Sequence, residues 1–146
     1  MVILIKKRHR SLPVATARVR GILKTVAGLL QLKDKEISVL FTTDEEIGEL
    51  NREYRGKNGA TDVLSFPLDT TTCTALGDIV ISVDTAQREA LAADISLDDM
   101  IDALLIHGLL HLLGYDHVGV SRAQAKEMRA KEDALFFAIK NYHLTR

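Results

Sequence analysis

The chain has 146 residues, of which 47% are hydrophobic and 27% are charged, which suits one compact domain over residues 1–146 with a real hydrophobic core. Its single cysteine, Cys73, excludes an internal disulfide and favours the reducing cytoplasm. The net charge of −1 excludes a strongly basic protein, and no apolar run approaches a membrane span, so a cytoplasmic protein without a membrane partner is expected.

The charge is distributed unevenly along the chain. Residues 1–35 hold nine Lys/Arg and one acid (+8), whereas residues 36–146 hold ten Lys/Arg and nineteen Asp/Glu (−9). A basic segment of this kind can steer a protein to a phosphate backbone. The same pattern is also typical of the solvated face of a helix. Aromatic residues make up only 5% of the chain, which disfavours a module that reads single-stranded bases by stacking.

The first half of the chain alternates between strand and helix patterns. The apolar run Val2–Ile5 predicts a short buried strand. Apolar residues at helical spacing predict a helix over about 13–30, where a proline near the start is tolerated in the first turn. Glu36–Thr42 is a predicted strand. Thr43 is predicted to cap a helix that carries three acids in its first turn, where the helix dipole favours them, and that ends near residues 52–54.

The second half predicts two further strands and three helices. A loop with two glycines covers Arg55–Ala60. Asp62–Phe66 alternates and stops at a proline, as an edge strand does. A threonine-rich loop, Asp69–Ala75, leads to the predicted strand Asp78–Val83. Ser96 has the pattern of a helix cap. The three helices are expected at about 84–92, 97–113 and 121–140.

Strands and helices therefore interleave, but only four strands are predicted. We expect an α+β fold, with a small mixed four-stranded β-sheet packed with about five helices. The strand–helix–strand crossovers predict the parallel pairs within that sheet. The sequence contains no internal repeat and no linker long enough to divide the chain.

Three of the five histidines lie within eleven residues. His107 and His111 are four residues apart on the helix predicted over 97–113, so they share one face in adjacent turns. Gly114 can take the positive φ that ends a helix, and His117 follows three residues later. Three neutral imidazoles suit Zn²⁺ and leave a fourth position for water or substrate. The spacing predicts a zincin-like three-histidine site that holds one zinc ion per chain.

The same spacing occurs in the metzincin proteases, with one departure. Those enzymes carry glutamate directly after the first histidine as general base. This chain has Gly108 there, which cannot accept a proton. Peptide hydrolysis is therefore disfavoured, and a zinc metalloprotease-like hydrolase is kept as an alternative.

Several segments together closely resemble the YbeY family of metal-dependent endoribonucleases. His107–His117 (HGLLHLLGYDH) is similar to that family's histidine signature, and Thr61–Pro67 (TDVLSFP) is similar to its second block. The resemblance covers most of the chain, although the first thirty residues match only in general pattern. Further similar segments are Asn51–Arg55 with Gly56 and Lys57, Leu76–Ile79, and Met128 with Glu132 in the last helix.

The resemblance implies a single-strand-selective, zinc-dependent endoribonuclease. It implies action in the 3′-end maturation of 16S rRNA and in ribosome quality control. Ribosomal RNA and the small ribosomal subunit are then the expected partners, with no DNA. Two alternatives stay open. One is the zinc protease-like hydrolase, and the other is a non-catalytic ribosome-binding factor whose zinc is structural.

Arg55 and Asp116 are the expected catalytic residues. By the resemblance, Arg55 is functional, and its planar fork of donors suits a phosphate. Asp116 either orients an imidazole N–H or stabilises the turn after Gly114. Asp62 and Ser65 are expected to bind substrate with Arg55, although strand structure explains those two equally well. Zinc can act as a Lewis acid on a phosphoryl oxygen or lower the pKa of bound water to about 7.

Overall fold

The computed structural model describes residues 1–68, 74–115 and 121–144, so Cys73, Asp116 and His117 lie outside the described residues. Within them the chain forms four strands and five helices, which confirms the expected α+β fold. No helix in these ranges is long and apolar enough to cross a bilayer. In chain order the elements are β1 (Val2–Lys7), α1 (Thr16–Leu29), β2 (Glu36–Thr42), α2 (Asp44–Arg55), β3 (Val63–Pro67), β4 (Ala75–Ser82), α3 (Val83–Ala93), α4 (Leu97–Leu112) and α5 (Arg122–Lys140).

The sheet is mixed, and its strand order is β1-β2-β4-β3. β2 pairs in parallel with both β1 and β4, whereas β3 pairs with β4 antiparallel. The prediction that β3 is an edge strand is confirmed, and Pro67 at its end fits that position because proline donates no backbone hydrogen bond. β1 forms the opposite edge.

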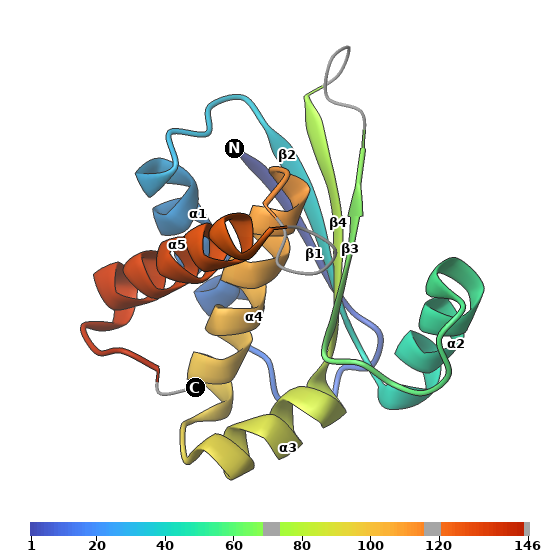
Figure 1. Ribbon diagram of the computed structural model, residues 1–146. Helices are drawn as coiled ribbons and strands as arrows, with labels where there is room; N and C mark the ends of the chain where they lie inside the picture. The colour runs from blue at the N-terminus through green and yellow to red at the C-terminus, as the bar shows by residue number, and fades with distance from the viewer. Residues whose placement is uncertain (69–73, 116–120, 145–146) are drawn as a thin grey trace.

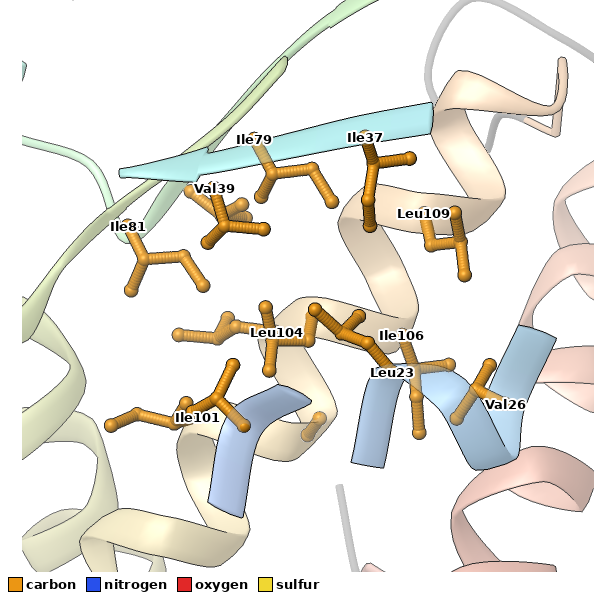
Figure 2. Packing of buried hydrophobic residues seen from close by; sticks show 14 of the residues in the cluster. Leu23, Val26, Ile37, Val39, Ile79, Ile81, Ile101, Leu104, Ile106 and Leu109 are labelled. Atoms are coloured by element: carbon orange, nitrogen blue, oxygen red, sulfur yellow. The ribbon is translucent and has the colours of Figure 1, made fainter. Parts of the chain in front are cut away.

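The two faces of the sheet are covered differently (Figure 1). α1 and α4 cover one face, α5 packs over these two helices as an outer layer, and α2 lies on the other face. The main core lies under the three helices, where isoleucines and valines of β2 and β4 meet α1 and α4 (Figure 2). A second, smaller cluster lies under α2, where Ile47 packs with Leu64 and Val80. Successive strand residues point to opposite faces, so β3 and β4 contribute to both clusters.

β1 differs from its prediction as a buried strand. It continues to Lys7, because its pairing with β2 extends to Phe41. Ile3 is 4% exposed, but Val2 and Leu4 are 56% and 50% exposed. An edge strand covered by helix on one face alternates in this way, and the apolar run could not reveal that its second face is open.

β4 begins three residues before its predicted start at Asp78. Gly77 interrupts the apolar pattern, yet it pairs with Pro67 at φ +142°. A Cβ at that position would collide with the backbone oxygen of Phe66. Glycine is thus required for the close approach of β3, and the strand continues through it.

The helix bounds lie close to the expected ones. Pro13 precedes α1, which begins at Thr16. Ser96 caps α4 by accepting a hydrogen bond from the backbone N–H of Asp99, as predicted. α4 is buried on most sides, because it lies between the sheet and α5. Gly114, two residues past its end, has φ +98°.

A buried charge network joins the helices over the main core. The carboxylate of Asp102 on α4 is fully buried. It lies 2.8 Å from the guanidinium of Arg18 on α1 and 2.5 Å from the ammonium of Lys140 on α5. Asp99 binds the same ammonium at 3.0 Å. Two cations therefore compensate one buried carboxylate and fix α1 and α5 against α4.

Candidate active site

The histidine pair lies on the half-buried face of α4. His107 and His111 are half-buried, whereas the residues between them are buried against the sheet and α5. Their ring centroids are 4.6 Å apart, and their Nε2 atoms lie 3.0 Å apart. That spacing lets both nitrogens reach one ion at a zinc–nitrogen distance of about 2 Å. Two of the three expected ligands are therefore together.

A buried carboxylate orients the first histidine. Oε1 of Glu132 on α5 lies 2.7 Å from Nδ1 of His107, and the Glu132 side chain is 3% exposed. A carboxylate at Nδ1 keeps the ring proton there, so Nε2 presents its lone pair toward His111. Carboxylates orient metal-binding histidines in this way, so the donor set fits a zinc ion.

Sequence reasoning gave Glu132 no role in the site. The available signal was its place in the amphipathic pattern of α5, where Ala125, Met128, Leu135 and Phe136 are the other buried residues. A carboxylate in an apolar stripe requires a partner, because burying it alone costs several kcal/mol, on the order of the usual ionic desolvation penalty.

The third expected ligand is not described, and zinc binding itself stays a prediction. His117 and its neighbour Asp116 fall in the range 116–120, outside the described residues. Among residues 1–68, 74–115 and 121–144, no group of three or more His, Cys, Asp or Glu side chains is placed to hold an ion. The described residues contribute two imidazole nitrogens and the carboxylate that orients one of them.

A cleft of about 780 Å³ follows β3, and the histidine pair lines it together with residues from the end of α2. Arg55, Asp62 and Ser65 also line this cleft. Every expected site residue that the structure describes is thus at one place. Because β3 is an edge strand, the cleft has α4 on one side of the strand and α2 on the other.

Arg55 is placed by the end of α2. It is the last residue of that helix, and Gly56 ends the helix in the left-handed conformation at φ 67°. The Arg55 side chain is exposed. An exposed guanidinium at the rim of a cleft can turn its donors toward a phosphate.

Asp62 and Ser65 are held by hydrogen bonds within the fold. Oδ1 of Asp62 accepts from the backbone N–H of Val63 at 2.7 Å. The hydroxyl of Ser65 donates to the carbonyl oxygen of Gly108 at 3.2 Å, which ties β3 to α4. Both side chains therefore have a structural role in addition to their place in the cleft.

A second carboxyl group lies beside Asp62. Partial burial and the Asp62 carboxylate raise the pKa of Glu89 on α3 to about 7. Glu89 therefore keeps its proton in much of the population at neutral pH and donates it to Asp62. No local pattern in the sequence links these residues, because they are 27 positions apart on different elements.

Gly108 faces the sheet. A Cβ added there would lie 3.0 Å from Cγ2 of Ile79 on β4. A glutamate at this position would require the Ile79 side chain to shift by a few tenths of an ångström, so the packing disfavours a larger side chain in the place of the metzincin base. This geometry agrees with the reading that Gly108 disfavours peptide hydrolysis.

Four of the nine cations in the basic N-terminal segment have partners within the fold. Arg18 binds Asp102, and Arg8 binds Glu46. Arg20 donates to the carbonyl of Ile3, and Lys7 donates to three loop carbonyls. β1 also lies at the sheet edge opposite β3. For these four cations the structural interpretation is supported over the phosphate-steering one.

Comparison with known proteins gives a consistent result. A family model described as Endoribonuclease YbeY matches residues 5–140. A protein of that name from Syntrophus aciditrophicus is 40% identical over 99% of this chain and 93% of the relative. Another of that name, from Geobacter sulfurreducens, is 39% identical over 97% of each chain. The solution structure of TM1509 from Thermotoga maritima is similar at a TM-score of 0.68 and 25% identity, covering 96% of this chain and 90% of that one.

Proposed function

Because the chain belongs to the endoribonuclease YbeY family, we propose that it is a zinc-dependent nuclease that cleaves single-stranded RNA in the cleft along β3. Its substrate is the precursor of 16S rRNA at the 3′ end, on the small ribosomal subunit, and it also acts on the RNA of defective ribosomes. The observation that carries the proposal is the paired Nε2 atoms, 3.0 Å apart, with His107 held by buried Glu132 in the cleft that Arg55 also lines.

Cleavage of a phosphodiester builds negative charge on the phosphate. A zinc ion, when bound, supplies Lewis acidity to a phosphoryl oxygen or activates a water molecule. Glu132 holds the proton at Nδ1 of His107 and so keeps Nε2 available as a ligand. Arg55 binds the non-bridging phosphate oxygens through its paired N–H donors. Asp62 and Ser65 keep the floor of the cleft in place through their bonds to Val63 and Gly108.

The metal requirement is tested with the zinc-loaded protein and two RNAs, one unstructured and one a stable hairpin. We expect cleavage of the unstructured RNA, loss of cleavage after chelation, and recovery when zinc is returned. His111→Ala should lose zinc in metal analysis. Binding to small ribosomal subunits without cleavage of any RNA would favour the ribosome-binding factor with structural zinc.

Arg55→Ala tests the phosphate contact. The variant should keep its zinc and its melting temperature but lose RNA cleavage by about 100-fold or more, the usual cost of removing one charge-stabilising donor. Arg52→Ala is the matched control, because Arg52 is an exposed arginine one turn earlier on α2 that does not line the cleft. Equal cleavage by the two variants would remove the phosphate-binding role.

A further inference from the structure

The few aromatic residues of this protein are concentrated at the cleft. The chain has three tyrosines, four phenylalanines and no tryptophan. Three of these seven rings, Tyr54, Phe66 and Tyr115, line the cleft along β3. The low aromatic content of the whole chain disfavours base stacking. The residues that line the cleft are richer in aromatic rings than the chain as a whole.

Tyr54 is held in place but left open to solvent. Its side chain is 62% exposed, the largest exposure of any aromatic residue in the chain. Its ring packs edge-to-face with Phe66 at a centroid distance of 5.3 Å and an interplanar angle of 72°. Phe66 in turn packs against the small core cluster under α2. The exposed ring therefore rests on a fixed support, and little freedom is lost when a flat ligand stacks on it.

The surroundings of Tyr54 fit a single nucleic-acid strand. Arg55, the next residue, lines the same cleft and is exposed. Binding sites for single strands pair aromatic rings for the bases with cations for the phosphates. Beyond Phe66 the chain continues with exposed Pro67 and with Leu68, which is 50% exposed, so the apolar surface extends past the ring pair.

We propose that Tyr54 and Phe66 form a nucleobase-stacking subsite that holds one unpaired base next to the phosphate bound by Arg55. The proposal rests on RNA being the substrate. Bases of a duplex are already stacked on their neighbours, so this subsite selects unpaired nucleotides. Tyr54 would then be a residue that determines the proposed preference for single strands. The contact to the base is made by the ring of Tyr54 and not by its hydroxyl.

The test uses initial rates of cleavage by the zinc-loaded protein on a labelled unstructured RNA. Tyr54→Leu, which keeps apolar bulk but removes the ring, should raise KM about 5-fold or more, as loss of one stacked base does, with kcat changed much less. Tyr54→Phe should retain the wild-type KM. Phe137→Ala on α5 is the matched control, because Phe137 is an exposed aromatic (41%) that does not line the cleft.

A second set of RNAs carries a single abasic nucleotide at successive positions. When the abasic nucleotide occupies the position that stacks on Tyr54, KM should rise for the wild type and for Tyr54→Phe. KM should not rise further for Tyr54→Leu, because that variant already lacks the ring on which the base stacks. Melting curves check that the variants fold. A wild-type KM for Tyr54→Leu, or an equal rise in KM for the Leu and Phe variants, would overturn the subsite.

Failure of the stacking subsite can be distinguished from failure of the proposed nuclease function. If the wild type cleaves no RNA, the nuclease proposal fails, and anisotropy with the same RNAs still measures whether binding depends on the Tyr54 ring. If Tyr54→Leu cleaves RNA normally but no longer binds purified small subunits, the ring pair is a protein-docking surface and the stacking subsite is wrong.

Discussion

At the scale of single residues, Glu132 is the side chain that orients His107 in the proposed metal site. Glu132→Gln replaces the carboxylate that holds the Nδ1 proton of His107 with a weaker neutral acceptor. We expect zinc affinity to fall about 10- to 100-fold, the usual effect of removing a carboxylate behind a histidine ligand. Competition with a chromogenic chelator measures it.

Asp133→Asn is the control for that substitution, because Asp133 is the exposed neighbour of Glu132 on the same helix. It should bind zinc as the wild type does. An unchanged affinity in Glu132→Gln, with an intact melting curve, would mean that the carboxylate does not orient the ligand.

The carboxyl pair Asp62–Glu89 predicts a dependence of stability on pH. Burial and the charge of Asp62 raise the pKa of Glu89 from 4.5 to about 7, and nearby Arg88 opposes this only in part. Between those two values the folded protein holds a proton that the unfolded chain has released. This contribution to stability is therefore complete below about pH 4.5, falls as the pH rises, and levels off above about pH 7.

The glutamine of Glu89→Gln cannot ionise, so the stability of this variant should not show the decline with rising pH that Glu89 causes. Urea unfolding at pH 5 and pH 8 should show that the variant gains stability relative to the wild type at the higher pH. Glu49→Gln, an exposed glutamate on α2, serves as control and should show no such gain. A constant difference between Glu89→Gln and the wild type across this range would contradict the raised pKa.

Whether a contact between two residues could be predicted depends on how far apart they are in the sequence. The pairing of His107 with His111 follows from helix geometry alone, and it is confirmed at 3.0 Å. Glu132 is 25 residues further along and reaches His107 only because α5 packs on α4. No local period encodes that packing, so the histidine pair could be predicted and its orienting carboxylate could not.

At the scale of elements, Gly108 sets how closely α4 approaches the sheet. Gly108→Ala brings a methyl group to 3.0 Å from Ile79. The resulting overpacking costs about 1–3 kcal/mol, against about 1 kcal/mol gained in helix propensity. We expect net destabilisation and a shift of the histidines, measured by urea unfolding and by zinc affinity.

Gly21→Ala provides a comparison of opposite sign. Gly21 lies in the exposed part of α1, and nothing lies within 4 Å of an added Cβ. That variant should gain up to about 1 kcal/mol of stability. A stabilised Gly108→Ala would show that Ile79 moves aside easily.

Element boundaries were predictable where one simple pattern runs without interruption. Glu36–Thr42 has the predicted bounds, because its alternation is clear and a loop precedes it. The start of β4 was misplaced because Gly77 normally breaks a strand, whereas here the close approach of Phe66 requires it. The face of β1 that lies open was not predictable, since it depends on which helices cover the sheet.

At the scale of the whole molecule, Asp102 links three helices that are distant in sequence. Asp102→Asn leaves Arg18 and Lys140 without their shared buried carboxylate. We expect a loss of about 3–5 kcal/mol in the free energy of unfolding, as for other broken buried pairs. Chemical denaturation monitored by circular dichroism measures it.

Asp98→Asn is the matched control. Asp98 also contacts Arg18, at 3.5 Å, but its side chain is 53% exposed. Such surface pairs contribute about 0–1 kcal/mol. Similar losses for the two variants would show that burial of Asp102 does not strengthen the network.

The charge asymmetry of the chain illustrates what composition alone cannot resolve. The count of +8 over residues 1–35 is correct, but Arg18 and Arg20 are bound to Asp102 and to the carbonyl of Ile3. The arginine that lines the cleft instead comes from α2, within the acidic part of the chain. The sum of charges over a segment therefore does not show which cation lies at the cleft.

β3 carries the two halves of the cleft on its alternating faces. Ser65 bonds to the backbone of α4, and the next residue, Phe66, packs toward α2. A slip of one residue in this strand would exchange the two faces, so that Ser65 would point away from α4 and Phe66 away from α2. A newly made chain is surrounded by RNA during translation. Until β3 pairs with β4 in the correct register the cleft is not assembled, so the proposed cleavage of RNA cannot begin before that pairing forms.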